Sequence, residues 1–179
     1  MYKIERIGAS NEDIRVTSAS ALTGEDFTRL ARDLGMTPAA AHKSGFVCVR
    51  AADQRQRLDV LWNGKETEID VEPGDLIVTS MDEDREVMRD TGGKPNTYAV
   101  KPDEFASLYE RATGATEFGD IYRPRGVVKV EALYLSGGFE IMAPWGKLQR
   151  ADAGYILKNG DKVYGNNKET FEKTYRIAT

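Results

Sequence analysis

The side chains that most often perform nucleophilic or metal chemistry are scarce in this sequence of 179 residues, which holds one histidine and one cysteine. His42 lies in AAAHKSG, and Cys48 alternates with valines in FVCVRAA. A zinc site of the usual ligands needs more such side chains, and a Ser-His-Asp triad would have to use His42 without a G-x-S-x-G motif. Phosphate-binding glycine motifs are also missing. We therefore expect no catalytic residue, no metal and no cofactor, and we lean against an enzyme.

Carboxylates form the densest run of polar side chains. Glu66, Glu68, Asp70 and Glu72 alternate along the chain, so they would line one face of a strand. Such a face is typical of a solvated surface that protects a sheet edge. A calcium or magnesium site has no matching loop signature here. An enzyme with a carboxylate-based site is kept as an alternative, which a cleft holding two carboxylates of shifted pKa would support.

Large aromatic and cationic side chains supply the candidates for binding. Trp62 and Trp145 are each followed closely by a Gly-Lys pair, and Tyr122, Arg123 and Arg125 lie together in YRPR. Ligand sites usually form in concave surfaces between packed units. We predict that these five residues bind a protein partner or a small ligand at the seam between two halves of the chain.

The two halves follow residue 45 and are similar in sequence. FVCVRAA (46–52) matches VVKVEAL (127–133), and LIVTS (76–80) matches YILKN (155–159). Alternating apolar residues in these stretches are typical of strands. The order of the matching stretches is the same in both halves, so the chain is predicted to contain an internal repeat.

An aromatic frame closes each half. Tyrosine, phenylalanine and tyrosine recur at one spacing in two places, namely Tyr98, Phe105 and Tyr109, and then Tyr164, Phe171 and Tyr175. The last two rings of each frame are four residues apart, so they would share one face of a short helix. We interpret the frames as buried core that holds each helix to its hairpin, with aromatic walls around a ligand as the alternative.

The elements together predict an α+β fold. Two pseudo-repeated units, each an antiparallel β-hairpin plus a helix, would share one core because a unit of about fifty residues buries too little surface alone. An N-terminal segment (1–45) with a short strand at MYKIERI and a helical part precedes the first β-rich repeat (46–112). A linker (113–126) leads to the second β-rich repeat (127–179). An acidic insertion (82–95) in the first repeat is expected to form an exposed hairpin tip or loop.

The N-terminal segment carries a clear helix signal. Thr23 can cap a helix that has Asp26 three residues later, and Gly35 can end it in a left-handed conformation. A second short helix is predicted over residues 37–45. The small residues within 30–43 resemble a DNA-binding helix-turn-helix, although the second helix would be short for a recognition helix. A simple αα corner and a DNA-binding motif both stay open.

Composition and hydropathy place the chain among globular proteins, with 40% hydrophobic and 30% charged residues. No apolar run approaches the roughly 20 residues of a membrane helix. A lone cysteine forms no internal disulfide and fits a reducing compartment. We therefore expect a cytoplasmic protein without membrane contact.

Charge is distributed unevenly around a net charge of −4. Residues 46–120 carry an excess of acidic side chains, and residues 121–179 carry an excess of basic ones. The preferred function is a non-enzymatic binding or protein-interaction module. The alternative is a nucleic-acid-binding accessory protein that uses the basic second repeat for phosphate contacts, although the acidic middle argues against nucleic acid.

PGDLIVTS, followed by YAVKPDEFASLYE, resembles small bacterial and phage proteins that share a "PGDYG" or "PGDW" motif. Those proteins commonly read Pro-Gly-Asp-aromatic, then a tyrosine-bearing strand, then Lys-Pro-Asp-x-Phe-x-x-x-Tyr. The resemblance covers about residues 46–110 and 127–176. Leu76 stands where an aromatic residue is usual, and the second half reads DAG (152–154) in place of Pro-Gly-Asp. The resemblance implies a bacterial or prophage-borne protein and brings no activity with it.

Overall fold

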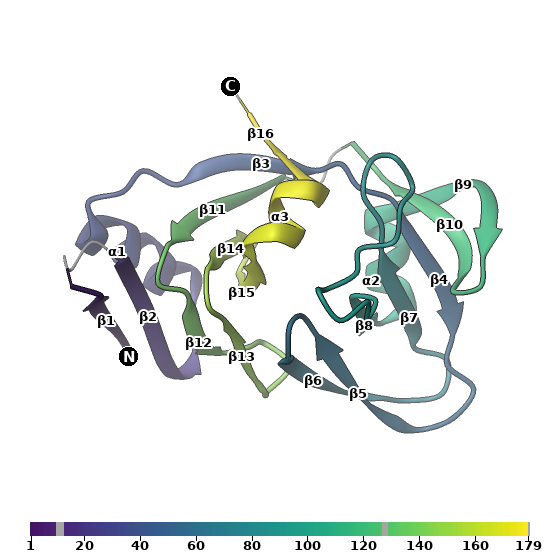
Figure 1. Ribbon diagram of the computed structural model, residues 1–179, viewed down its shortest axis with the longest axis horizontal. Coiled ribbons are helices and arrows are strands. Elements are labelled where there is room, and N and C mark those ends of the chain that lie inside the picture. Colours follow the sequence, from purple (N-terminus) through teal and green to yellow (C-terminus); the bar gives the residue numbers. More distant parts are fainter. Residues whose placement is uncertain (10–12, 127–128, 179) are drawn as a thin grey trace. The chain divides into compact units, whose positions relative to one another are not determined.

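The computed structural model describes residues 1–9, 13–126 and 129–178, and most of its regular structure is β-strand (Figure 1). The helices are α1 (Gly24–Leu34), α2 (Pro102–Leu108) and α3 (Lys168–Thr174). The strands are β1 (Tyr2–Ile7), β2 (Asp13–Ala21), β3 (Ala39–Lys43), β4 (Val47–Ala51), β5 (Gln56–Leu61), β6 (Lys65–Val71), β7 (Leu76–Ser80), β8 (Thr97–Val100), β9 (Tyr109–Thr116), β10 (Gly119–Pro124), β11 (Lys129–Leu135), β12 (Phe139–Met142), β13 (Leu148–Ala151), β14 (Gly154–Asn159), β15 (Lys162–Asn167) and β16 (Tyr175–Ile177).

Contacts between residues divide the chain into two compact units. The terminal unit holds Met1–Ala41, Lys129–Glu172 and Ile177–Thr179. The central unit holds His42–Val128 and Lys173–Arg176. Each unit therefore combines stretches that are far apart in the sequence, and each has hydrophobic clusters of its own.

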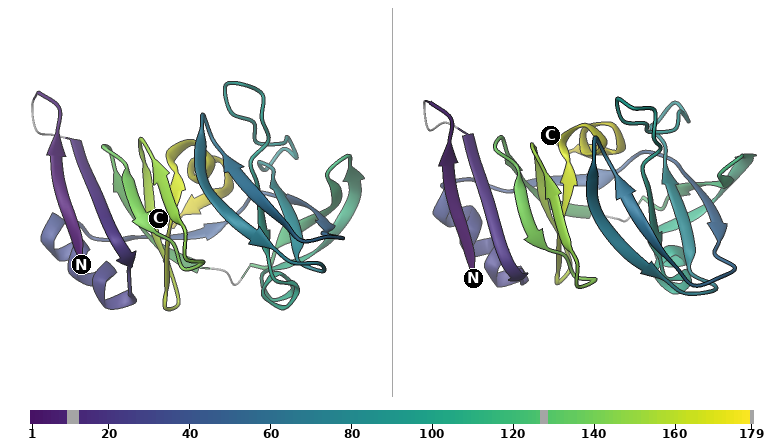
Figure 2. Two further views of the ribbon diagram at one scale, coloured as in Figure 1. Left: turned by 90° about the horizontal axis from the view of Figure 1, so that it is seen from below. Right: turned by 60° about the horizontal axis from the view of Figure 1, so that its bottom comes forward.

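The terminal unit contains a four-stranded sheet in the order β1-β2-β12-β13 (Figure 2). β12 runs parallel to β2, whereas the other neighbours pair antiparallel. A five-stranded sheet in the order β15-β14-β11-β3-β16 supplies β11, β14 and β15 to the same unit. The parallel pair joins residues that are more than a hundred positions apart, which local sequence patterns do not reveal.

The core of the terminal unit lies among α1 and strands of both sheets. Phe139 from β12 is fully buried and meets residues of α1, β2, β11, β14 and β15 in one cluster. Gly165 on β15 makes room for this ring, because a Cβ there would lie 2.2 Å from Phe139 Cζ. The buried members of the cluster are Val16, Leu22, Phe27, Leu30, Ala31, Leu133, Leu135, Phe139, Ile141, Ile156 and Val163.

The predicted first helix is confirmed, and the predicted second helix is wrong. Thr23 caps α1 in a capping box with Asp26, and Gly35 ends it with a φ of 66°. Residues 37–45 do not form a helix, since residues 39–43 are strand β3. β3 pairs inside the five-stranded sheet, and these long-range backbone bonds override the local helix signal of an alanine-rich stretch. The αα corner and the helix-turn-helix therefore both fail for want of a second helix.

The central unit contains a five-stranded sheet in the order β8-β7-β4-β10-β9, together with the β5–β6 hairpin. Val47, Val49 and Val78 lie on the face of this sheet that α2 covers through Phe105. Cys48 points to the opposite face and packs with Met81 in a second cluster. Residues 113–126, expected to be a linker, form the end of β9, a turn and β10.

Four residues of the aromatic frames are core, as predicted, whereas Tyr98 and Tyr164 are half-buried. The predicted helical position of the last ring is wrong, because Tyr109 and Tyr175 begin strands β9 and β16. Phe105 and Tyr109 are buried and stack with ring centroids 4.7 Å apart. Phe171 and Tyr175 are also buried, and Phe171 stacks on Tyr155 at 3.9 Å. Two short helices thus anchor their sheets through aromatic contacts, which accounts for the recurring spacing.

The acidic insertion is anchored by its own carboxylate. Asp90 is 9% exposed and accepts backbone N–H groups from Lys94, Asn63 and Gly92 at 2.9–3.0 Å. The backbone bond from Lys94, with those from Asn63 and Gly92, outweighs burial and holds the pKa of Asp90 below its usual value. Residues 82–95 are therefore tied to the β5–β6 turn.

The predicted α+β fold class, with two hairpin-plus-helix units behind a helical N-terminal segment, is wrong. The described chain is mostly β, with three helices of which two span seven residues each. The segment 1–45 contributes strands β1, β2 and β3 beside a single helix. Strands dominate because residues 39–43, which were predicted to be helical, form β3, and because most of the supposed linker belongs to β9 and β10.

Candidate functional site

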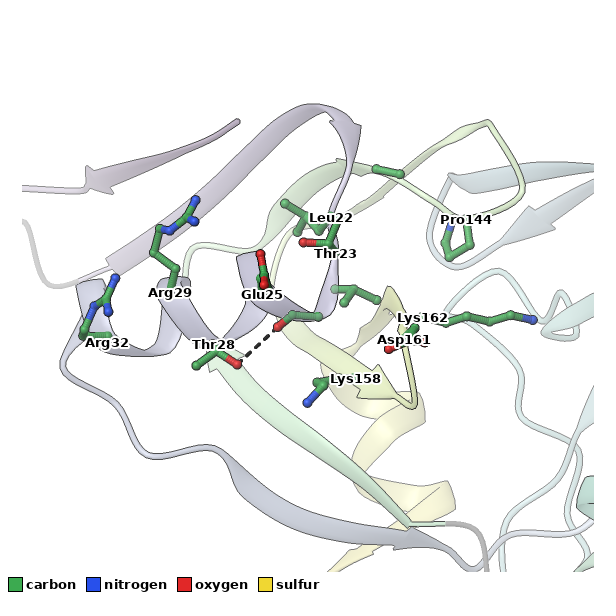
Figure 3. Close-up of a pocket in the computed structure, with 13 residues that line it drawn as sticks. Leu22, Thr23, Glu25, Thr28, Arg29, Arg32, Pro144, Lys158, Asp161 and Lys162 are labelled. Atoms are coloured by element: carbon green, nitrogen blue, oxygen red, sulfur yellow. Dashed lines mark hydrogen bonds between the residues drawn. The ribbon is translucent and has the colours of Figure 1, made fainter.

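A groove of about 1010 Å³ opens beside α1 in the terminal unit (Figure 3). Its wall combines the start of α1, the loop after β12 and the turn between β14 and β15. The residues that line it are Ala21, Leu22, Thr23, Gly24, Glu25, Thr28, Arg29, Arg32, Pro144, Lys158, Asp161, Lys162 and Val163.

Local structure explains how these side chains reach one groove. The capping box fixes the first turn of α1, which sets the direction of the following side chains. Gly160 closes the β14–β15 turn with a φ of 61°, a conformation that favours glycine. The stem of Lys158 packs on the start of α1, since a Cβ at Gly24 would lie 3.4 Å from Lys158 Cε.

Positive charge prevails along the groove. Arg29, Arg32, Lys158 and Lys162 line it against two carboxylates, Glu25 and Asp161. Arg29 and Lys158 have acidic neighbours outside the lining, because Arg29 Nη1 lies 3.6 Å from Asp26 Oδ1 and Lys158 Nζ lies 3.2 Å from Glu131 Oε2. Both pairs are on the surface, where such pairs keep most of their solvation.

The charged groups spread along the groove and do not meet at one point. In Figure 3, Arg29 and Arg32 follow α1, Lys158 lies near Thr28, and Lys162 extends away from them. Catalysis by proton transfer or nucleophilic attack needs groups within hydrogen-bonding distance of one reacting centre. The arrangement therefore suits binding of an extended anionic partner better than catalysis.

The N-terminus of α1 is capped by side chains of its own segment. Asp26 N–H donates to Thr23 Oγ1 at 3.1 Å, and Thr23 N–H donates to Asp26 Oδ2 at 2.9 Å. The backbone bond from Thr23, with the nearby Arg29, lowers the pKa of Asp26 despite some burial. A carboxylate thus occupies the positive end of the helix, and the cationic side chains alone give the groove its charge.

Three of the predicted binding residues lie together on β10 and just after it. Arg123 Nε lies 2.9 Å from Glu110, and Arg125 Nη1 lies 3.6 Å from the same carboxylate. Arg125 also donates to the Ala106 carbonyl at 3.1 Å. Tyr122 packs edge-on against a buried phenylalanine with ring centroids 5.0 Å apart. Both arginines are therefore ion-paired with Glu110, and Tyr122 packs against the hydrophobic cluster beneath α2.

The two predicted tryptophans belong to different units. Trp62 is half-buried after β5 in the central unit, where its backbone N–H donates to the Gly64 carbonyl at 2.8 Å. Trp145 lies in the terminal unit, is 38% exposed and follows Pro144 of the groove wall. The predicted site at the seam of the two halves stays a prediction.

Sequence reasoning missed the groove, although parts of its signal were present. Arg29 and Arg32 are three residues apart, off the apolar stripe of α1. Lys158 and Lys162 flank the Asn-Gly-Asp turn that predicts a hairpin. Their meeting depends on α1 packing against β15, which is a long-range contact that no local pattern encodes.

The other candidate chemistry has a structural explanation. Burial raises the pKa of the Cys48 thiol, which a bond from Thr116 only partly offsets, so a reactive thiolate is disfavoured. On β6, Glu68 pairs with Arg57 and Lys65, and Asp70 also pairs with Arg57. Glu66 is buried, with 7% of its surface exposed, so the predicted solvated face is wrong for this residue. Within the described residues, no three His, Cys, Asp or Glu side chains gather closely enough to hold a metal ion.

The Pro-Gly-Asp turn has a structural role of its own. Asp75 is 6% exposed, accepts the Glu72 backbone N–H at 2.9 Å and binds Lys101 Nζ at 2.9 and 3.0 Å. Burial alone would raise the pKa of Asp75, but Lys101 and the Glu72 N–H outweigh it and lower the pKa. The two parts of the PGD and Lys-Pro-Asp pattern are thus joined by one ion pair.

Comparison with protein-family models, with curated proteins and with solved structures finds no match. None of the described helices has the length and apolar character that crossing a membrane requires.

Proposed function

We propose that the protein is a non-enzymatic binding module whose groove beside α1 takes an acidic segment of a protein partner. The observation that carries the proposal is the gathering of four cationic side chains at one groove of a chain with a net charge of −4. An excess of one sign of charge at a concave surface attracts an oppositely charged partner and orients it, and here four cations outnumber the two carboxylates of the lining.

A protein segment fits the lining better than a nucleic acid does. Ala21 and Pro144 are exposed apolar residues beside the charges, which is the mixture typical of protein interfaces. Glu25 and Asp161 would repel a continuous phosphate backbone but can face a basic or polar residue of a peptide. No aromatic side chain is among the lining residues, so bases would have no surface for stacking.

Nucleic-acid binding by the basic second repeat is the alternative. Lys158 and Lys162 of that repeat do line the groove, which is the observation in its favour. Arg123 and Arg125, which would have extended the basic surface, are held by Glu110 instead. A cytoplasmic location remains part of the proposal, supported by one buried cysteine and no other thiol.

The test is a titration with a fluorescent twelve-residue peptide rich in Glu and Leu, in low salt, followed by anisotropy. A triple variant, Arg29→Gln, Arg32→Gln and Lys158→Gln, removes three charges from the groove. We expect it to bind the peptide about tenfold more weakly, because three surface pairs contribute about 0.5 kcal/mol each. Added salt should also weaken binding of the peptide to the natural chain, because it screens the charges of the groove.

The matched control removes three exposed cations elsewhere, through Arg6→Gln, Arg50→Gln and Lys94→Gln. It changes the net charge equally and should leave the affinity within about twofold, because distant surface charges are screened. Equal losses in both triple variants would refute the groove assignment. A single-stranded oligonucleotide of the same charge that binds more tightly than the peptide would favour the nucleic-acid alternative, and no binding of either probe would end the proposal.

A further inference from the structure

A lysine ammonium stands among three tyrosine rings in the central unit. Lys43 Nζ lies 5.7 Å from the ring centroid of Tyr98 and 5.5 Å from those of Tyr109 and Tyr175. It also donates to Tyr98 Oη at 3.4 Å. The lysine ends β3, and the rings come from β8, β9 and β16, so four separate strands build this tyrosine cage.

The rings of the tyrosine cage are held in place by their own packing. Tyr109 is 6% exposed and stacks on Phe105 with an interplanar angle of 19°. Tyr175 is 7% exposed, and Tyr98 is half-buried against the same hydrophobic cluster as Tyr109. Aromatic faces that are fixed before a cation arrives lose little entropy on binding it, which favours affinity.

The spacing of the tyrosine cage is that expected around a methylated nitrogen. A methyl group on the nitrogen would extend about 1.5 Å from it, by the usual carbon–nitrogen bond length. Methyl carbons pointing at the rings would then lie about 4 Å from the ring centroids, which is carbon–carbon contact distance. The three distances from Lys43 Nζ to the ring centroids are nearly equal, so this spacing applies to each ring.

We propose that Tyr98, Tyr109 and Tyr175 form a binding site for a methylated ammonium group, and that Lys43 occupies it as a tethered competitor. Quaternary ammonium ions bind aromatic cages through cation–π attraction together with methyl–ring contact. A tethered lysine has a high effective concentration at the site, so a free ligand must displace it. Withdrawal of the Lys43 side chain exposes the site.

Tetramethylammonium is the probe, and the aromatic resonances of the full chain in solution report its binding. Lys43→Ala should bind it about tenfold or more tightly than the natural chain, because the competitor is gone. Adding Tyr98→Leu to Lys43→Ala should remove most of that gain. Lys94→Ala, which deletes an exposed lysine of the same unit, is the matched control and should bind as the natural chain does.

A merely structural role for Lys43 gives a different result. Lys43→Ala would then be less stable than the natural chain but would bind tetramethylammonium no better than Lys94→Ala, and the proposal would be overturned. Unchanged binding after Tyr98→Leu would overturn it equally. Where Lys43→Ala does not fold, Lys43→Gln removes the charge, keeps most of the stem and is titrated in its place.

The source of the ammonium group is separated by two further probes. Choline represents free quaternary amines, and a short peptide with one trimethyllysine represents modified proteins, with the unmethylated peptide as its control. Tighter binding of the methylated peptide than of choline assigns the site to a protein ligand. The opposite order assigns it to a small molecule, and failure of both against Lys43→Ala refutes the site.

Discussion

At the scale of single residues, the contacts that matter most here are those made by buried polar groups. Asp75 is the clearest case, because its carboxylate is 6% exposed and a single lysine from the start of α2 neutralises it. A pair of this kind differs from a surface ion pair, since removing one partner leaves a desolvated charge behind. The Pro-Gly-Asp sequence is therefore a stability element as well as a turn.

Lys101→Met should lower the free energy of unfolding by about 1–3 kcal/mol, because Asp75 would keep its burial and lose its cation. Urea denaturation followed by circular dichroism measures the change. Arg55→Met is a matched control, since Arg55 also lies 2.9 Å from its partner, Glu72, but their side chains are 79% and 45% exposed. That variant should lose less than about 1 kcal/mol.

The loss of stability in Lys101→Met should depend on pH, because the pKa of Asp75 is lowered in the folded chain. A depressed carboxyl pKa gives stability that is present above the unfolded value, about 3.9, and lost as pH falls through the folded value. The difference in free energy of unfolding between the natural chain and Lys101→Met should therefore be largest at neutral pH and become smaller in acid. A gap that stays constant below pH 4 would contradict the ion-pair explanation.

Gly165 tests close packing at the same scale. Its α-carbon lies so near the Phe139 ring that an added Cβ would clash at 2.2 Å. Gly165→Ala should destabilise the chain by about 1–3 kcal/mol, the usual range for overpacking. Phe139→Leu shortens the ring side chain, so the double variant should be more stable than the sum of the two single losses predicts. Additive losses in urea denaturation would show that another contact of Gly165 matters more.

At the scale of elements, one side chain replaces strand pairing between β13 and β15. Gln149 is 4% exposed, donates from Nε2 to the Gly165 carbonyl and accepts the Gly165 N–H, both at 2.7 Å. The amide thus makes the two bonds that a neighbouring strand would make. Two strands from different sheets of the terminal unit are joined in this way, which protects their backbones from water.

Gln149→Glu makes this bridge depend on pH. A protonated carboxyl can both donate to and accept from Gly165, whereas a carboxylate only accepts. The folded-state pKa of the new glutamate should therefore lie above its unfolded value, and its stabilisation should be full in acid and lost as pH rises through the folded pKa. Thermal unfolding at pH 4 and pH 8 measures the stability of Gln149→Glu. Gln149→Leu is the control, because its side chain does not titrate.

How far the elements follow from sequence depends on how local their signals are. Thr23, Asp26 and Gly35 lie in one short stretch, so the bounds of α1 could be predicted. β3 could not, because its strand state depends on partners more than eighty residues away, and its alanine-rich sequence favours helix. The groove was missed for the same reason, since its cations line one surface only after α1 packs on β15.

At the scale of the whole molecule, the interleaved course of the chain decides which pieces can fold alone. β2 needs β12 as a neighbour, and the core around α1 needs residues of β11, β14 and β15. A stretch ending at residue 128 contains α1 and β2 but none of these partners. Buried apolar side chains of α1, such as Phe27 and Leu30, would then remain in water.

A fragment of residues 1–128 should therefore be digested within its first 41 residues at protease concentrations that the full chain withstands. Residues 42–128 should persist longer, because they hold the whole five-stranded sheet of the central unit. Mass spectrometry of the digestion products over time gives the order of cleavage. Equal protection of residues 1–41 in the fragment and the full chain would show that this segment folds without the later strands.

The division of the terminal unit among three stretches also affects the protein while it is being made. Residues 1–41 leave the ribosome before their partners, which begin at residue 129. At about 5–20 residues per second, β2 and α1 spend several seconds without β12 and without the core residues of β11, β14 and β15. The central unit can be completed almost fully in that interval. We therefore expect the newborn chain to fold from its middle outwards, with the apolar face of α1 as the part on which a chaperone has most time to act.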